Sequence, residues 1–160
     1  MVFSRAQEVA LICNGTEHAR VRAGTATLPD LPLSFVFELS YTPGKLEAVS
    51  YQNGREVSCD ALETAGAPAA LRLVAEGALR ADGHSAACVQ VEVVDSAGRL
   101  VPGAAPELTA ALTGQGFLAG FGSANPITTD NYAAGRCHAY RGQALAVVRA
   151  GYEPDAATLT

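Results

Sequence analysis

The 16 acidic residues are the first candidates for chemistry, because two carboxyl groups at a fixed separation can act as general acid and as base or nucleophile. Glu47, Glu56 and Glu92 alternate with apolar neighbours, so each falls on the outward face of a predicted strand. Asp82 and Asp95 stand in predicted turns. Because solvated faces usually carry the charge of a protein, we predict that this chain has no catalytic carboxylate.

The three histidines are the next candidates, since a histidine can activate a serine or cysteine that an acid helps to orient. Each of His18, His84 and His138 would need a positioned Ser or Cys and an orienting acid. His84 lies in Asp82-Gly83-His84-Ser85, where a turn explains every residue. The motifs G-x-S-x-G and H-E-x-x-H do not occur. We predict neither a nucleophilic catalytic site nor a metal site.

The four cysteines do not form a C-x-x-C motif, and the adjacent pair Cys137-His138 lacks the usual spacing of zinc ligands. Cys13 and Cys59 share alternation phase with apolar neighbours, Val57 among them, so both are predicted to face a core. A Cys13–Cys59 disulfide and fully reduced thiols both remain open. Because the chain is not rich in cysteine, the composition favours reduced thiols in the cytoplasm, with the periplasm or secretion as the alternative.

Glycine-rich segments and aromatic residues indicate no ligand. Gly114-Gln115-Gly116 and Gly120-Phe121-Gly122 lie between predicted strands instead of opening a helix, so they do not predict a phosphate cradle. Asn14-Gly15-Thr16 matches a glycosylation sequon, but a tight turn already explains it. With no Trp and 6% aromatic residues, the chain has few rings to stack on sugars. We therefore expect no cofactor-binding residue, no cofactor and no direct sugar binding.

Length and composition limit the class of protein. The chain has 160 residues, a net charge of −5, 49% hydrophobic residues and 17% charged residues, against about 25% charged in an average domain. It is long enough for one domain or two small ones, and too short for a (β/α)8 barrel of about 250 residues. No basic cluster favours nucleic acid or an anionic membrane, and no apolar run approaches the roughly 20 residues of a membrane-spanning helix.

Period-two alternation dominates the chain and predicts strands, with Asn14-Gly15 and Asn53-Gly54 as hairpin turns. The prolines of residues 27–32 exclude that stretch from a central strand. A run of small residues at 63–70 predicts a boundary between domain 1–68 and domain 69–160. The last strand, at residues 156–160, is expected to be truncated. Short strands between turn signals predict an all-β fold of two tandem immunoglobulin-like antiparallel β-sandwiches. The predicted strands are residues 8–13, 18–23, 33–39, 45–51, 55–59, 71–75, 88–94, 107–112, 117–121, 136–140, 144–149 and 156–160.

Several motifs together carry a family resemblance, among them Tyr41-Thr42-Pro43-Gly44-Lys45 and Arg141-Gly142-Gln143. In their order and spacing they resemble the two accessory sandwiches that follow the catalytic barrel in bacterial β-galactosidases of glycoside hydrolase family 2. Two positions depart from the pattern: Cys13 stands where the family usually has a leucine, and the family's Gly-Asn-Gly-x-Pro loop appears as Gly122-Ser123-Ala124-Asn125-Pro126. The matching stretches are residues 4–15, 41–49, 53–57, 63–66, 89–95, 98–102, 114–120 and 141–149.

The resemblance implies a non-catalytic piece of a retaining enzyme that hydrolyses terminal β-D-galactosides. The family's two catalytic glutamates belong to the barrel, and no residue here matches either motif, so no catalytic residue is carried over. The implied partners are the barrel and neighbouring domains of the same polypeptide, together with contacts in a homo-oligomer. A carbohydrate-binding module and an adhesin-type segment without an enzyme are the alternatives.

Overall fold

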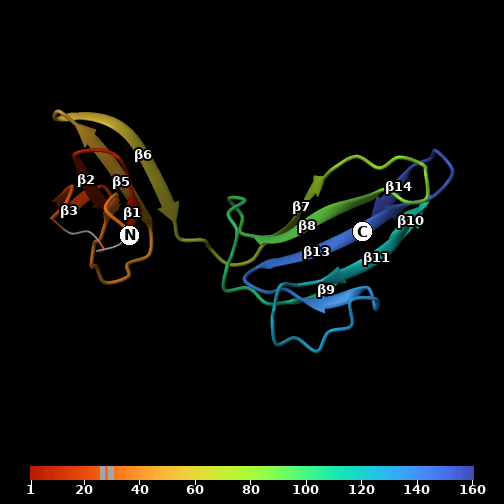
Figure 1. The fold of residues 1–160 in the computed structure, drawn as a ribbon. Coiled ribbons are helices and arrows are strands. Elements are labelled where there is room, and N and C mark those ends of the chain that lie inside the picture. The colour runs from red at the N-terminus through yellow and green to blue at the C-terminus, as the bar shows by residue number, and fades with distance from the viewer. Residues whose placement is uncertain (26–27, 29–30) are drawn as a thin grey trace. The chain divides into compact units, whose positions relative to one another are not determined.

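The structure is a computed structural model that describes residues 1–25, 28 and 31–160, and Figure 1 shows its fold. The chain divides into two compact units, Met1–Thr64 and Ala65–Thr160. The predicted boundary after residue 68 differs because Ala65 packs against the core of the second unit and the Gly66 amide donates to Asp95. Of the predicted proline break at residues 27–32, Thr27, Pro29 and Asp30 lie outside the described residues.

The first unit is built on a four-stranded antiparallel sheet in the order β3-β2-β5-β6. A much smaller ladder, β1 with β4, pairs Val2 with Phe35 and Phe3 with Ser34. The two sheets are therefore very unequal in size. The strands of this unit are β1 (Val2–Phe3), β2 (Glu8–Cys13), β3 (Thr16–Arg22), β4 (Ser34–Phe35), β5 (Lys45–Gln52) and β6 (Arg55–Glu63).

Two Asn-Gly turns set the register of the large sheet, as the sequence predicts. Asn14 and Asn53 have φ values of 49° and 51°, and the glycines that follow have 80° and 74°. Positive φ at both central residues gives a turn whose twist matches that of the flanking strands. Each turn therefore closes a hairpin, β2–β3 and β5–β6, and β2 and β5 pair at the centre of the sheet.

The core of the first unit lies where the small ladder covers the large sheet. Val9, Leu11 and Phe35 are 0%, 4% and 1% exposed. Two predictions fail away from this covered area. The predicted strand 33–39 forms a ladder only at Ser34–Phe35, and Val57 and Cys59 are exposed because β6 is an edge strand that nothing in the unit covers.

The second unit has a four-stranded antiparallel sheet in the order β11-β13-β8-β7, with the ladders β9–β12 and β10–β14 packed against it. The predicted strand 107–112 is divided, because β9 pairs with β12 and β10 pairs with β14. The strands are β7 (Ala70–Glu76), β8 (Ala86–Val94), β9 (Glu107–Thr109), β10 (Leu112–Gly114), β11 (Gly116–Gly122), β12 (Arg136–His138), β13 (Gln143–Ala150) and β14 (Ala157–Leu159).

The core of the second unit is made by alternate residues of β8 and β13 and by Phe121, which is 2% exposed. Leu108 of β9 and Cys137 of β12 close it from the other side, so two layers enclose one core. Both units are therefore antiparallel β-sandwiches, and the described residues include no helix. Within that described part, no helix is long and apolar enough to cross a membrane.

Candidate functional site

The carboxylates that the sequence singles out lie apart from one another along the strands and turns. Lys45 Nζ contacts Glu47 at 2.7 Å, and Glu56 lies exposed on the edge strand β6. Glu92 is held by Arg72, whose Nη2 lies 2.6 Å from Oε2, while the amides of Gln90 and Gln143 donate to Oε1. Each of these contacts is structural, and none pairs two carboxyl groups.

Asp95 is the one residue of this group whose burial the sequence did not reveal. Its side chain is 1% exposed, and it accepts hydrogen bonds from the amides of Gly66, Ala97 and Arg99 and from Arg99 Nε, all between 2.8 and 2.9 Å. The backbone hydrogen bonds from Gly66 and Arg99 hold the pKa of this carboxyl far below its usual range. An acid so firmly ionised and enclosed organises a turn and cannot deliver a proton.

Among the described residues, no histidine side chain forms a hydrogen bond with a serine, threonine or cysteine that it could activate. His18 Nε2 is 3.4 Å from the carbonyl oxygen of Glu38, and His84 packs edge-on against Tyr152 with ring centres 6.4 Å apart. His138 comes nearest to a catalytic arrangement, because its Nδ1 lies 3.3 Å from Asp130 Oδ1 and Cys137 is its neighbour in sequence.

The geometry of β12 separates that cysteine from that histidine. Successive strand residues point to opposite faces, so Cys137 enters the core at 1% exposure while the His138 side chain is 61% exposed. Burial raises the pKa of the Cys137 thiol, with the Asp130 charge as a smaller cause. A thiol kept protonated in an apolar core is a poor nucleophile.

The cysteines of the first unit do not form a disulfide. Cys13 on β2 pairs with Leu46 of β5, whereas Cys59 on β6 pairs with Val49 of β5. The two cysteines are therefore separated by two strand spacings, about 9.6 Å, which exceeds the span of a disulfide. All four cysteines are free, and no group of three His, Cys, Asp or Glu within the described ranges could hold a metal.

The Gly120-Phe121-Gly122 segment accommodates an aromatic ring. A Cβ atom on Gly122 would collide with the ring of Tyr132, so the glycine allows the tyrosine to lie against the strand. Leu145 and Val147 complete a shallow apolar hollow of about 290 Å³ beside this ring. The buried Oγ of Ser123 has no hydrogen-bond partner among the residues that the structure describes. The glycines thus serve packing within the sandwich.

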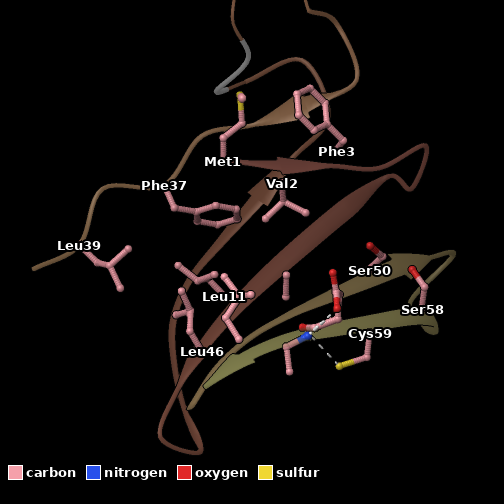
Figure 2. A pocket seen from close by; sticks show the side chains of 14 residues that line it. Met1, Val2, Phe3, Leu11, Phe37, Leu39, Leu46, Ser50, Ser58 and Cys59 are labelled. Atoms are coloured by element: carbon pink, nitrogen blue, oxygen red, sulfur yellow. Dashed lines mark hydrogen bonds between the residues drawn. The ribbon is translucent and has the colours of Figure 1, made fainter. Parts of the chain in front are cut away.

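A larger hollow is a groove in the first unit, with a volume of about 480 Å³ (Figure 2). Leu11, Leu46 and Ala48 form its floor on β2 and β5. Above them, Figure 2 shows Val2 of β1 beside Phe37 and, further along the same extended stretch, Leu39. We call this feature the β5–β6 groove, because β6 forms its open side with Ser58, Cys59, Asp60, Ala61 and Leu62.

The β5–β6 groove is lined mostly by apolar side chains, which favours packing against another protein segment over catalysis. Asp60 is the one acidic side chain among the described residues that line it, so the groove cannot supply a pair of carboxylates. Large apolar side chains are nevertheless left open to solvent around it: Leu62 is 71% exposed and Phe3 is 62% exposed. An apolar hollow of this kind marks a surface that a protein segment can cover.

Each half of the chain matches a known protein family. Residues 71–160 match the family described as glycoside hydrolase family 2 C-terminal domain 5, and residues 1–58 match a family described as a domain of unknown function. A β-galactosidase of Bacteroides ovatus is 30% identical over 159 residues, which are 99% of this chain and 18% of the relative. A β-glucuronidase of Formosa agariphila is 33% identical over 114 residues, which are 68% of this chain and 12% of the relative.

The fold agrees with these matches. A crystal structure of a glycoside hydrolase family 2 member from Bacteroides cellulosilyticus superimposes with a TM-score of 0.90 at 31% identity. That alignment covers 99% of this chain and 21% of the crystallised one, so this chain spans about a fifth of the length of such relatives. This chain therefore belongs to glycoside hydrolase family 2 and corresponds to a C-terminal, all-β part of its members.

Proposed function

We propose that this chain is a non-catalytic pair of β-sandwich modules within a retaining family 2 glycoside hydrolase that removes terminal β-D-galactosyl residues. The observation that carries the proposal is the extent of the match, since the chain aligns almost completely with 18% of a β-galactosidase. The separated carboxylates described above support it, because retaining hydrolysis needs two carboxyl groups about 5–5.5 Å apart. The reaction then belongs to the remaining part of the parent enzyme.

The role of the two modules is structural. Each buries its own core, so it offers a preformed surface against which the catalytic domain of the same polypeptide can pack. The apolar β5–β6 groove supports this role in the first unit. Rigid sandwich faces also suit contacts between parent chains in a homo-oligomer, which sedimentation of the full parent enzyme would detect.

Activity and sugar binding test the proposal directly. The purified chain should release no chromophore from a chromogenic β-galactoside above the buffer rate, and titration calorimetry with galactosides and plant polysaccharides should show no saturable heat. Turnover that tracks the purified protein would refute the non-catalytic role. Saturable binding at millimolar or better affinity would favour a carbohydrate-binding module, and a surrounding gene without a (β/α)8 barrel would favour an adhesin-type segment.

We also propose a cytoplasmic location for the parent enzyme. Four free cysteines, two of them exposed, support it because exposed thiols persist most readily in a reducing compartment. Fractionation of the producing cells tests this, and recovery of the parent enzyme with periplasmic or secreted markers would refute it.

A further inference from the structure

The small ladder of the first unit stops abruptly beside the β5–β6 groove. Val2 pairs with Phe35 and Phe3 with Ser34, and the Ser4 amide continues the ladder by donating to the Leu33 carbonyl at 3.0 Å. In the other direction the pairing ends at Val2. The large sheet beneath has four paired strands, so the sandwich has one full layer and one layer that covers only part of it.

The stretch that follows β4 has the pattern of a strand but lacks a partner. Phe35, Phe37 and Leu39 recur at every second residue, and Phe37 and Leu39 both line the groove (Figure 2). No described strand pairs with residues 36–42. Within the part of the chain that the structure describes, one hydrogen bond reaches the backbone of residues 36–40, from the His18 ring to the Glu38 carbonyl oxygen at 3.4 Å. A backbone edge and an apolar face are thus both open along the same stretch.

The register of the ladder tells which segment would complete it. The pairing is antiparallel, so each step from Val2 toward the N-terminus moves one residue forward on the partner strand. Met1 comes opposite Val36, and the positions preceding Met1 come opposite Phe37, Glu38 and Leu39. Ala48, Ser50 and Ser58 below this path are small, which leaves room for large apolar side chains to enter from above.

We propose that the β5–β6 groove binds an extended segment of the parent polypeptide, namely the residues that immediately precede Met1. This segment pairs antiparallel with residues 36–39 and inserts alternate apolar side chains over Leu11, Leu46 and Ala48. The proposal rests on the proposed function, because it needs a longer parent chain, and relatives about five times as long supply that precedent. A β-strand added to an open edge gains main-chain hydrogen bonds together with side-chain pockets.

A fusion experiment tests the proposal. The probe is a segment of about ten residues, enough for one strand and its approach, taken from directly before the matched region of the Bacteroides ovatus β-galactosidase and fused to Met1. A second fusion carries an idealised alternating Val–Thr strand, and a scrambled segment serves as the control. The readout is the rate of maleimide labelling at Cys59, which is exposed and lines the groove.

Cys88 provides the internal reference, because it is also exposed and lies on β8 in the second unit. We expect at least one of the two strand fusions to slow labelling of Cys59 by about tenfold or more and to leave Cys88 unchanged, whereas the scrambled fusion changes neither. Leu39→Asp should abolish the protection without unfolding the unit, because Leu39 is already 37% exposed.

Two outcomes would overturn the proposal. One is equal labelling of Cys59 in both strand fusions and the scrambled control. The other is protection of Cys59 in the unfused chain that increases with protein concentration alongside a sedimenting dimer, because the occupant would then be a second copy. The galactoside turnover assay judges the proposed function separately, since labelling of Cys59 does not depend on activity.

Discussion

Replacing Leu11 by alanine tests how the groove affects the stability of the first unit. Leu11 is 4% exposed on β2, yet the β5–β6 groove of about 480 Å³ opens above it. The substitution removes three carbon atoms, which at about 0.8 kcal/mol each amounts to about 2.4 kcal/mol of lost transfer free energy. Water or neighbouring side chains can enter the vacated space, so the additional cavity contribution is small. We expect a loss of about 2–3 kcal/mol, the lower part of the usual range.

Phe121→Ala is the matched comparison in the second unit. Phe121 is 2% exposed and lies between two layers, so the vacated space remains closed and the loss should be about 3–5 kcal/mol. Val57→Ala is the surface control, since Val57 is 57% exposed and the change should stay under about 0.5 kcal/mol.

Native-state hydrogen exchange suits this comparison because it reports the opening free energy of each unit separately. The amides of Val9 and Ala10 report on the first unit, and that of Ala146 reports on the second; all three residues are fully buried. A loss below about 0.5 kcal/mol for Leu11→Ala would mean that Leu11 is not a core residue. A larger loss than that of Phe121→Ala would contradict the argument that an open groove reduces the penalty.

Three further predictions concern the turns, the buried acid and the thiols. In denaturant unfolding, Asn14→Ala should destabilise the first unit by about 1–2 kcal/mol more than Asn53→Ala. Of the two turn asparagines, only Asn14 uses its side chain: Oδ1 accepts from the Lys45 amide at 2.8 Å, and Nδ2 donates to the Pro43 carbonyl. Because the folded-state pKa of Asp95 is lowered, its stabilising contribution is complete above a pH of about 4, the unfolded value, and is lost as the pH falls toward the folded value. The melting temperature of the second unit should therefore drop on acidification, and Asp95→Asn should lower it at neutral pH and flatten the drop; an unchanged acid profile in Asp95→Asn would contradict this. In a thiol-reagent assay Cys59 and Cys88 should react at once and Cys137 only after unfolding, so rapid reaction at Cys137 in the native protein would show that it is not in the core.

The elements that depend on neighbouring residues alone follow from the sequence. Residues 8–13 alternate and end at Asn14-Gly15, and the strand Glu8–Cys13 has those bounds. The turn at Asp95-Ser96-Ala97-Gly98 is equally local, since Asp95 Oδ1 accepts from the Ala97 amide and Gly98 has a φ of 77°. The residue types within each turn determine its backbone conformation, so these turns can be predicted without knowing any distant contact.

The features that could not be predicted from the sequence are those that depend on which strand or layer packs against a given segment. Residues 33–39 alternate like a strand, but a ladder forms only where β1 provides a partner, at Ser34–Phe35. Cys59 has the phase of a core residue, but whether a face is covered depends on the opposing layer. The burial of Asp95 likewise requires Gly66, 29 residues earlier, to donate to it. The available signal was Arg99, placed to reach back to an acid four residues before it.

The segment that joins the two units is short and is hydrogen-bonded at both of its ends. Thr64 is tied to the first unit, since its amide donates to the Gly44 carbonyl at 2.9 Å and its Oγ1 accepts from the Gly44 amide. Gly66 is tied to the second unit through Asp95 at 2.8 Å. Proteases cleave most readily where several residues can leave their contacts together, and only Ala65 lies between these two anchors. Limited digestion should therefore nick exposed loops before it separates the modules, so the pair will persist as a single fragment.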